Sequence, residues 1–387
     1  MKGVEADHRK AFYFSSIFLF MKILIIGHYP PHKGGVANHT NNLVKELRKK
    51  HEVHILTYGP IKPRKFEREF VHQVKVPQIF GLRGILFTFL ATLKIIKLQE
   101  RTKFDVIHAH YVGTTSYAGI LAKEKLNAPV VVTAHGSDLD FMSNLPLGRY
   151  FVKKSLSKSD LVIAVSHHLQ KKAISMGATK IRVIPNSIKT IKKEDAKREY
   201  ITFIGALTPY KDPHTFIKLA KRFPHEKFLV VGDGPLRTDL EKQAPKNVKF
   251  LGYKEDVGGI LSKTKLLVVP SLREGFGLVI IEANSLGVPV IGRAVGGIKE
   301  LIREGKNGYT FKTFEELVEK VEILLSNKKA LKMGKIGKTV SSQYSWERIR
   351  HLIEESYREV LGERNDNCNK HARKGRLEEN QSSCEIY

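Results

Sequence analysis

The sequence is poor in cysteine and in long apolar runs. Its 387 residues include only two cysteines, Cys368 and Cys384, both near the end of the chain. The body of the chain therefore has neither a disulfide framework nor a cysteine metal site, which fits a reducing cytoplasm. No stretch of about 18 uncharged apolar residues is present, so no membrane-spanning helix is indicated.

Acidic residues are also scarce. There are 39 Asp and Glu against 66 Lys and Arg, which gives a formal net charge of +27. Such a field attracts polyanions: nucleic acid, anionic lipid headgroups or phosphorylated small molecules. The basic residues are dispersed and no RNA- or DNA-binding signature is present, so nucleic acid is not expected as a partner. A basic nucleic-acid-binding protein stays the non-enzymatic alternative.

Both ends of the chain differ from its middle. Residues 1–20 have a charged start and an apolar run, without the small-residue cleavage site of a secretory signal. We interpret them as an N-terminal extension upstream of a strand that begins near Met21, with a membrane-seeking segment as the alternative. Residues 363–387 have almost no apolar periodicity, which predicts a disordered tail.

Short runs of β-branched and apolar residues recur between these ends, each followed by a loop and a helix-length segment. They form two series, separated by a lysine-rich segment at 190–199. Apolar strands that alternate with helices are typical of parallel sheets covered on both faces. The sequence therefore predicts an α/β protein with two Rossmann-like, doubly wound domains that face each other across a cleft. The expected bounds are 1–20 for the extension, 21–189 and 200–344 for the domains, 345–362 for a terminal amphipathic helix and 363–387 for the tail.

Ligands of open parallel sheets bind beyond the carboxyl ends of the strands, so the residues that follow each strand are informative. After the first strand, Gly34 and Gly35 precede a helical pattern. Glycine lets a backbone approach a ligand closely, and a helix start presents free N–H groups to an anion; a tight turn is the alternative. In the second series, GDGPLR has Arg237 where a dinucleotide fingerprint needs its third glycine, so nicotinamide binding is not supported.

Histidines end two strands of the first series. His135 follows VVVTA at a strand end, where it could bond a substrate hydroxyl or serve as a satisfied structural residue; we favour the substrate role. His108 and His110 share one face of a strand, which raises metal binding as an alternative. No third ligand with defined spacing accompanies them, so no metal is expected.

The stretch EGFGLVIIE (274–282) places two carboxylates around glycine and apolar residues. Glu274 lies on a loop after a strand, and Glu282 lies inside the helix that follows. Backbone N–H groups at a helix start suit phosphates, and carboxylates accept from hydroxyls, which together describe a nucleotide-sugar site. The alternative is a helix cap and a salt-bridged helix residue. Lys211, after the first strand of the second series, would add a positive charge for a phosphate unless it is an ordinary solvated lysine.

Taken together, these residues resemble the retaining glycosyltransferases of the GT-B fold, specifically the large family 4, over about residues 21–362. The most specific part is PSLREGFGLVIIEANSLGVPVIGRAVGGIKELIREGKNGYTF (270–311), which is similar to the family's E-x7-E signature and its Gly-Gly and Asn-Gly turns. IRVIPNSI (181–188) resembles the segment that closes the first domain. The resemblance implies transfer of a hexosyl group from a nucleotide-sugar donor to a glycan or lipid-linked acceptor, with retention of configuration.

The resemblance also implies roles for particular residues. The first domain would face the acceptor, the second would bind the donor, and the terminal helix would return to the first domain. Lys211 would neutralise the diphosphate, Glu274 would position the sugar, and Glu282 would bind the ribose hydroxyls. His135 would touch the transferred sugar near the reacting carbon. The implied catalytic residues are His135, Glu274 and Lys211, and the implied donor-binding residues are Gly35, Lys211, Glu274, Gly275, Phe276, Gly277, Leu278 and Glu282. No cofactor and no metal are implied.

One residue departs from the family pattern. The family often has arginine after the glycine of the loop that ends in Lys211, where this chain has Ala206. Loss of one charge-assisted contact would cost about 1.5–3 kcal/mol. Either Lys211 and helix N-termini suffice, or another basic side chain substitutes, or activity is reduced. A nucleotide-sugar epimerase of the same fold stays the alternative enzyme, although the E-x7-E block favours transfer.

The acceptor side offers one further pattern. Residues 61–103 are basic and contain the apolar, helix-forming run QIFGLRGILFTFLATLKIIK. Such a segment could lie on an anionic membrane and admit a lipid-linked acceptor, or it could be a buried helix with a solvated end, which we favour. The expected location is the cytoplasm, and the alternative is the cytoplasmic face of the membrane.

Overall fold

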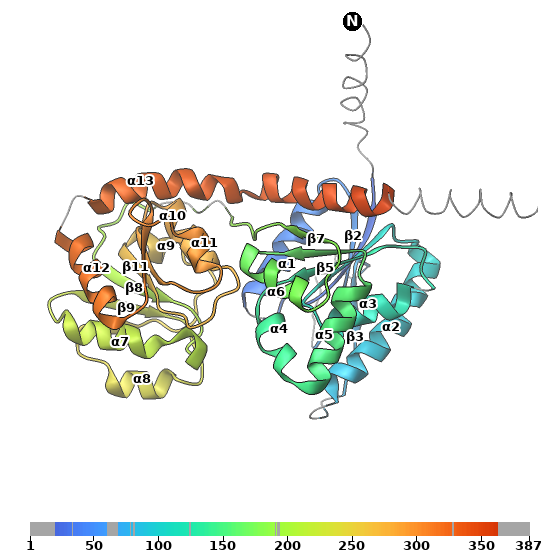
Figure 1. The fold of residues 1–387 in the computed structure, drawn as a ribbon, viewed down its shortest axis with the longest axis horizontal. Helices are drawn as coiled ribbons and strands as arrows, with labels where there is room; N and C mark the ends of the chain where they lie inside the picture. Colours follow the sequence, from blue (N-terminus) through green and yellow to red (C-terminus); the bar gives the residue numbers. More distant parts are fainter. Residues whose placement is uncertain are drawn as a thin grey trace, which may run out of the picture.

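The computed structural model describes residues 20–362 except 33, 60–68, 78, 80–81, 124, 190, 192–193 and 327–328. Two parallel sheets form two lobes, which a long helical segment spans along one side (Figure 1). We call the part with strands β1–β7 and helices α1–α6 the first lobe, and the part with β8–β13 and α7–α13 the second lobe. The predicted fold class is confirmed.

The first sheet has seven parallel strands in the order β3-β2-β1-β4-β5-β6-β7. The chain passes to the two sides of β1 in turn, which is the doubly wound arrangement. The strands are β1 Lys22–Ile26, β2 Glu52–Tyr58, β3 Val71–Val74, β4 Val106–His110, β5 Val130–Ala134, β6 Leu161–Ala164 and β7 Ile181–Val183. The helices are α1 Gly35–Leu47, α2 Arg83–Thr102, α3 Thr114–Lys123, α4 Ser137–Asp140, α5 Pro146–Lys158 and α6 His167–Ser175, with the 3₁₀ turn η2 Met142–Asn144.

Both faces of this sheet are buried, as its continuous apolar strands require. In β1, Leu24 and Ile26 pack with α2 and α3 on one face. The alternate residues Ile23 and Ile25 pack with α1 and with the last helix of the chain on the other face.

The second sheet has six parallel strands in the order β10-β9-β8-β11-β12-β13. Its strands are β8 Tyr200–Ile204, β9 Lys227–Val231, β10 Val248–Phe250, β11 Thr264–Val269, β12 Val290–Arg293 and β13 Gly308–Phe311. Its helices are α7 Pro213–Arg222, α8 Arg237–Gln243, α9 Gly258–Ser262, α10 Leu278–Ser285, α11 Ile298–Leu301, α12 Phe314–Ser326 and α13 Lys329–Ser341, with the 3₁₀ turns η3 Pro209–Lys211 and η4 Ser342–Tyr344.

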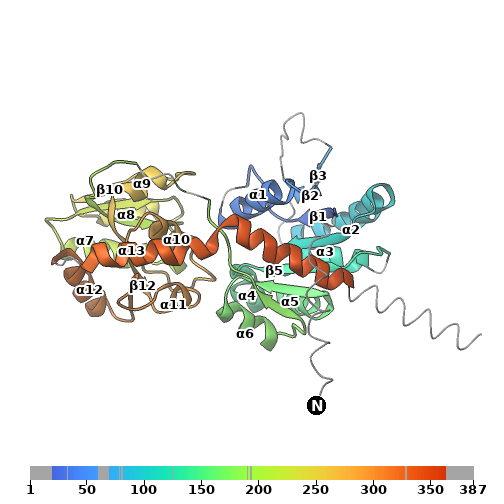
Figure 2. The same cartoon turned by 90° about the horizontal axis from the view of Figure 1, so that it is seen from above.

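The last helix, residues 346–362, continues from α13 and η4 and lies along the first lobe (Figure 2). Trp346, Ile353 and Tyr357 are buried in the core that it shares with α1. Because the chain crosses between the lobes at the linker and again here, two segments join them. They touch where the Ser187 hydroxyl donates to the Tyr344 carbonyl oxygen at 2.7 Å.

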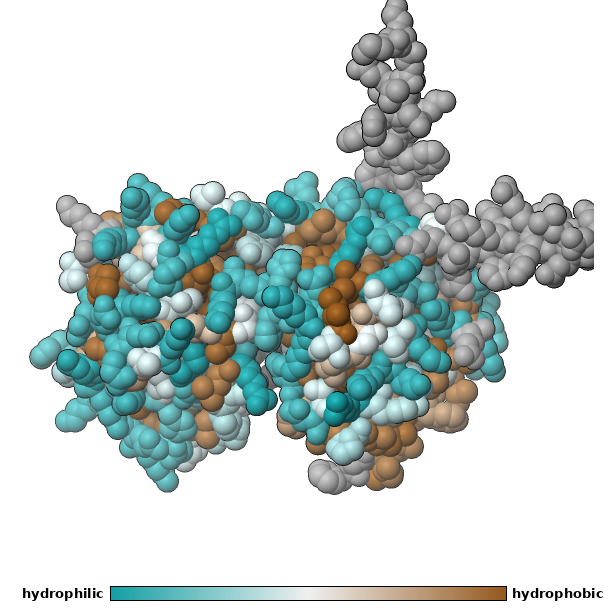
Figure 3. Space-filling view, viewed as in Figure 1, coloured by the Kyte–Doolittle hydropathy of each residue, from teal (hydrophilic) through white to brown (hydrophobic). Residues whose placement is uncertain are grey.

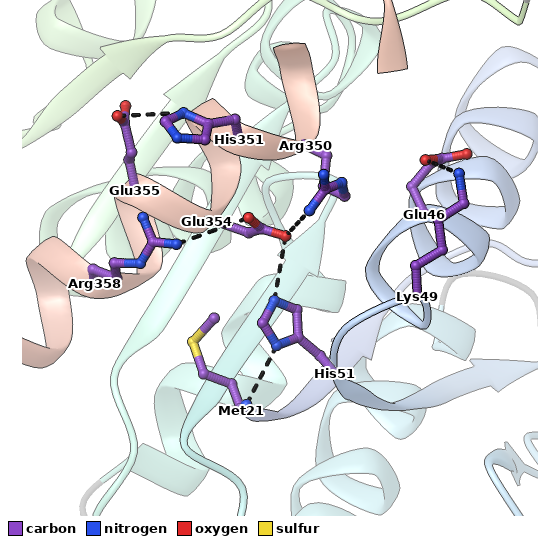
Figure 4. A network of polar contacts seen from close by, with 9 residues as sticks. All are labelled: Met21, Glu46, Lys49, His51, Arg350, His351, Glu354, Glu355 and Arg358. Atoms are coloured by element: carbon purple, nitrogen blue, oxygen red, sulfur yellow. Dashed lines mark hydrogen bonds and ion pairs between the residues drawn. The ribbon is translucent and has the colours of Figure 1, made fainter. Parts of the chain in front are cut away.

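A buried ion-pair network fixes this helix to the first lobe (Figure 4). The Glu354 carboxylate lies 2.5 Å from Arg350 and 3.3 Å from His51 Nε2, and its side chain is only 3% exposed. His51 Nδ1 in turn accepts from the backbone N–H of Met21 at 3.3 Å. Burial alone would raise the pKa of Glu354, but the hydrogen bonds and charges of His51 and Arg350 together outweigh it and lower the pKa to about 2. The carboxylate is therefore ionised and compensated at neutral pH.

Candidate active site

The lobes meet where strands of both sheets end. Gly136, after β5, has φ +124°, and a Cβ built on it would lie 2.9 Å from the Gly275 Cα. A Cβ on Gly275 would overlap the carbonyl oxygen of His135. The two backbones are thus in contact, and only glycine fits at either position. The Ser166 hydroxyl adds a hydrogen bond to the Gly275 carbonyl oxygen at 2.7 Å.

The loop that carries Glu274 is held from behind by Gly296 and Gly297. The Gly297 N–H donates to the Glu274 carbonyl oxygen at 2.9 Å. Gly296 has φ +46°, and a side chain there would overlap the Glu274 backbone. Gly277, with φ +103°, then turns the chain into α10. The start of α10 consequently presents its N–H groups from a fixed position.

The Glu274 carboxylate forms an ion pair with the Lys211 ammonium group. Both side chains are largely buried, with exposed fractions of 15% and 22%. Lys211 ends η3, and the next residue, Asp212, caps α7 by accepting from the Thr215 N–H. Asp212 also binds Arg293 at 2.6 Å, so that arginine is already paired. The structure thus brings together Lys211 and Glu274, two residues that the sequence predicted at the site.

The first lobe contributes the start of α1 to the same place. A Cβ built on Gly35 would lie 3.9 Å from Leu278 Cδ1, so the beginnings of α1 and α10 face each other across the lobes. Helix N-termini favour negative charge, and two of them converge here. Phe276 is buried, with its ring 5.9 Å from that of Tyr344.

His135 belongs to a row of imidazoles that runs from the lobe interface into the first lobe. His110 Nδ1 lies 3.1 Å from His135 Nε2. His108 is saturated by the Tyr357 and Thr133 hydroxyls, each at 2.7 Å. Burial, and then the nearby His108 and His28 rings, lower the pKa of His135 to about 3. The His135 ring is therefore neutral at pH 7 and acts as a hydrogen-bonding group.

Glu282 lies one turn into α10, and its surroundings differ from those of Glu274. Burial, followed by the charge of Asp256, raises the pKa of Glu282 to about 7. No side chain in the described ranges forms a hydrogen bond or ion pair with its carboxylate. Glu282 does not join the Lys211–Glu274 pair, and its carboxylate is free to accept from a ligand hydroxyl.

No group of three or more His, Cys, Asp or Glu side chains within the described residues is arranged to hold a metal ion. His108 and His110 are the pair for which the sequence raised metal binding. Three of their four ring nitrogens contact protein groups: both nitrogens of His108 contact hydroxyls, and His110 Nδ1 contacts His135. In the part of the chain that the structure describes, every helix is too short or too polar to span a bilayer.

Sequence reasoning missed several residues beside the interface. Tyr111 follows β4, and its hydroxyl lies 2.8 Å from the Ser137 hydroxyl. Its ring is 5.7 Å from that of His28, after β1, and the His28 Nε2 is 2.6 Å from the Tyr58 hydroxyl at the end of β2. A signal was available, because all three residues lie at the carboxyl ends of neighbouring strands.

Comparison with known families agrees with this architecture. Residues 33–192 match the model of Glycosyltransferase Family 4, and residues 185–340 match that of the glycosyl transferases group 1. An uncharacterized glycosyltransferase of Methanocaldococcus jannaschii is 33% identical over 352 residues, which is 88% of this chain and 99% of that protein. The chain belongs to the family 4 glycosyltransferases of the GT-B fold.

Further relatives and solved structures are similar over most of the chain. The N-acetyl-alpha-D-glucosaminyl L-malate synthase of Bacillus anthracis is 28% identical, over 86% of this chain and 95% of that protein. Sucrose-phosphate synthase from Thermosynechococcus elongatus superposes with a TM-score of 0.75 at 18% identity, over 88% and 99% of the two chains. Anabaena HepE, solved with UDP and glucose, has a TM-score of 0.73 at 22% identity, over 87% and 99%. These two structures share the fold.

Proposed function

We propose that the protein transfers a hexosyl group from a nucleotide-sugar to a glycan or lipid-linked acceptor, with retention of the anomeric configuration. The observation that carries this proposal is the Lys211–Glu274 ion pair on the loop that opens α10, set against His135 and Gly136 of the other lobe. It joins a cation and helix N–H groups for a diphosphate with a carboxylate for sugar hydroxyls. The donor would lie between the lobes.

Transfer breaks the bond between the sugar C1 and the diphosphate oxygen, and forms a bond between C1 and the acceptor oxygen. Negative charge develops on the leaving diphosphate, where Lys211 and the N–H groups at the starts of α1 and α10 would stabilise it. The acceptor hydroxyl attacks C1 from the same face of the sugar from which the leaving group departs, and its proton goes to the leaving phosphate oxygen. That path accounts for retention without a protein nucleophile.

The two glutamates and His135 would position the donor. Glu274, held by Lys211 and Gly297, would accept from sugar hydroxyls. Neutral His135 would hydrogen-bond the sugar without adding a positive charge beside the cationic C1 of the transition state. Glu282 would accept from the ribose hydroxyls, and these bonds would lower its pKa from about 7, because they favour the carboxylate.

Two relatives support a hexosyl donor by name. One is the Bacillus anthracis synthase that bears N-acetylglucosaminyl in its name. The other is an Escherichia coli protein named UDP-Gal:alpha-D-GlcNAc-diphosphoundecaprenol alpha-1,3-galactosyltransferase, which is 29% identical over 60% of this chain and 69% of its own length. The latter name also supports a lipid-linked acceptor.

The test is incubation with a panel of UDP-, GDP- and ADP-sugars and a panel of glycan acceptors. Release of nucleoside diphosphate, product mass and the NMR coupling of the new anomeric proton would be measured. The proposal expects a product with the anomeric configuration of the donor. An inverted product would contradict retention, and a sugar isomer released without an acceptor would favour an epimerase.

A further inference from the structure

A strip of ring side chains leads from the lobe interface to a cation at the edge of the first lobe. We call it the aromatic strip: Tyr111, His28, Tyr58 and Arg83. The Tyr111 hydroxyl contacts Ser137, next to the His135–Gly136 turn, at 2.8 Å. The Tyr111, His28 and Tyr58 rings follow one another at centroid distances of 5.7 and 5.3 Å. Arg83, the first residue of α2, lies with its Cζ 4.9 Å from the Tyr58 ring centre.

Arg83 carries a charge that no other described group neutralises. No Asp or Glu among the described residues forms an ion pair with it, whereas most other described arginines that are only partly exposed have a carboxylate or carbonyl partner, as Arg182 and Arg293 do. The three rings of the strip, by contrast, are neutral at pH 7, because burial raises the pKa of Tyr58 and Tyr111. Burial, then His32, then Arg83 lower the pKa of His28 to about 4, so the His28 ring bears no charge at pH 7.

A second, independent observation points to a missing ligand. His28 Nε2 is hydrogen-bonded to the Tyr58 hydroxyl at 2.6 Å. His28 Nδ1, in contrast, is buried and has no hydrogen-bond partner within the described chain. A buried nitrogen without a partner costs about 1–3 kcal/mol and usually marks an absent group. A neutral ring that accepts at Nε2 from the tyrosine hydroxyl donates at Nδ1. The orphan nitrogen is then a donor, and an anion or a hydroxyl satisfies it.

We propose that the acceptor carries an anionic phosphate group, that Arg83 binds this phosphate, and that the acceptor lies along the aromatic strip with its reacting hydroxyl at the Tyr111 end. Sugar rings stack on aromatic faces, and arginine binds phosphate through two parallel N–H groups. The inference rests on the proposed transfer reaction and adds the class of acceptor. The phosphate could belong to a soluble sugar phosphate or to a lipid-linked sugar, and both present the same chemistry to Arg83.

The first test measures phosphate binding by itself. Inorganic phosphate would be titrated by calorimetry at low salt into protein saturated with whichever of UDP, GDP or ADP binds, so that the donor site is filled. The proposal expects Arg83→Ala to weaken phosphate binding about tenfold or more. The matched control is Arg101→Ala, which removes an exposed arginine from the last turn of the same helix. Equal phosphate affinity in Arg83→Ala and the wild type would overturn the proposal.

The second test separates this inference from the proposed function. Transfer would be measured to a sugar, to the same sugar as its phosphate, and to a lipid-linked sugar diphosphate. We expect the KM for the phosphorylated acceptors to rise at least tenfold in Arg83→Ala, with nucleoside diphosphate binding unchanged. Preference for the soluble or for the lipid-linked form identifies the source of the phosphate. Equal use of the unphosphorylated sugar would contradict the inference and leave glycosyl transfer intact.

A different observation concerns the outer surface of the helices beside the strip. α3 packs between α2 and α5, and these helices cover one face of the first sheet. Large apolar side chains remain exposed here, and brown residues gather at the lower edge of this lobe (Figure 3). We call them the apolar edge: Leu82, Phe89, Leu93, Leu121, Phe141, Leu145, Leu147 and Tyr150, each 44–63% exposed.

The charge around the apolar edge is mainly positive. α2 carries Arg83, Lys94, Lys97 and Arg101 against the single acid Glu100. α5 carries Arg149, Lys153, Lys154 and Lys158 and no acid. Exposed apolar groups with flanking cations match the surface of a membrane with anionic headgroups. We infer that the apolar edge rests on such a membrane surface, without any helix crossing it.

Vesicle co-sedimentation tests this second inference. The wild type should sediment with vesicles of phosphatidylglycerol and phosphatidylcholine at low salt and much less with phosphatidylcholine alone. Phe89→Ser with Leu93→Ser should reduce binding at least fivefold. The control pair Ile174→Ser with Leu331→Ser removes equally exposed apolar groups from α6 and α13 and should change nothing. No sedimentation of the wild type, or equal loss in both pairs, would overturn the inference.

Discussion

Both lobes bring the carboxyl ends of parallel strands to the same interface, but they present different chemistry there. The first lobe presents neutral rings, those of His135, Tyr111 and His28. The second lobe offers an ion pair, Lys211 with Glu274, and a glycine loop that exposes backbone N–H groups. The topology decides where a ligand can lie, because strand ends converge. In the proposed function, the side chains decide which part of the ligand lies on which side: the diphosphate beside Lys211 of the second lobe, the donor sugar between Glu274 and His135, and the acceptor on the first lobe.

The lobes also differ in how they respond to acid. Within the described residues, all buried histidines belong to the first lobe: His39, His51, His54, His108 and His110. His214 and His225 of the second lobe are at least partly exposed. A comparison of the two lobes under mild acid would therefore expose this difference.

The largest effect is expected from acid alone. Burial lowers the pKa of His108 and His135 from 6.5 to about 3, so the unfolded chain takes up protons before the folded chain does. Their contribution to stability is present above pH 6.5 and is lost as the pH falls toward 3. Between pH 7 and pH 5 the loss is about 2 kcal/mol for each histidine.

The single tryptophan, Trp346, reports on this change because it is buried in the core of the first lobe. Urea unfolding followed by its fluorescence should shift to lower midpoints at pH 5. Hydrogen exchange of β8–β13, corrected for its intrinsic pH dependence, should change much less. Equal loss of stability in the two lobes would contradict the expectation that mild acid destabilises the first lobe more than the second.

The next effect comes from the ion-pair network of the terminal helix. The pKa of Glu354 lies near 2 against a usual 4.5, which corresponds to about 3 kcal/mol of stability at neutral pH. This contribution is complete above pH 4.5 and is lost as the pH falls toward 2. Glu354→Gln should lower the free energy of unfolding of the first lobe by about that amount.

The control for Glu354→Gln lies in the second lobe. Glu226 pairs there with Lys265, and both side chains are about a quarter exposed. Glu226→Gln should cost less than about 1 kcal/mol, because solvent screens the pair. Urea midpoints at pH 7 measure both variants, and similar losses would show that the buried network is no stronger than an ordinary surface pair.

Transfer activity should depend on the Lys211–Glu274 pair of the second lobe and not on the exposed lysines elsewhere in that lobe. Lys211→Ala and Glu274→Gln should each reduce transfer at least tenfold, because the first removes charge stabilisation of the leaving diphosphate and the second removes an acceptor for the donor sugar. Lys249→Ala, which removes an exposed lysine of β10, is the control. Steady-state rates with unchanged melting temperatures measure the effect, and near-wild-type turnover of either variant would refute the role assigned.

The smallest effect concerns the departure from the family pattern. Ala206 is exposed on the loop before Lys211, and Arg293 nearby is already bound to Asp212. Ala206→Arg should therefore tighten nucleoside diphosphate binding a few-fold, by about 1 kcal/mol. A calorimetric titration measures it. Unchanged affinity would show that the existing cation and helix starts already saturate the diphosphate.

The sequence predicts the fold class because short, continuous apolar strands alternate with helices, and that prediction is confirmed. Two short strands escape this pattern: β3 (VHQV) and β13 (GYTF), which are edge strands with little apolar content. The sequence also identifies the family, because the block from 270 to 311 places many turns and carboxylates at fixed spacing.

The partners of the site residues could not be predicted in the same way. The Lys211–Glu274 pair joins residues far apart in sequence, and the His110–His135 contact depends on which strands are neighbours. The strand order β2-β1-β4 brings Tyr58, His28 and Tyr111 together, so a doubly wound topology applied to strand ends would have suggested the aromatic strip. Spacing alone gives no sign that Arg83 has no carboxylate partner among the described residues, because that depends on the side chains around it in the fold.

The division of labour between the lobes is tested most directly by one binding measurement. UDP, GDP and ADP would be titrated by calorimetry into the wild type, Lys211→Ala and Arg83→Ala at fixed low salt. We expect Lys211→Ala to lose at least tenfold in affinity for the diphosphate that binds, and Arg83→Ala to keep the affinity of the wild type. Equal losses in the two variants, or no loss in Lys211→Ala, would contradict the assignment of the donor diphosphate to the second lobe.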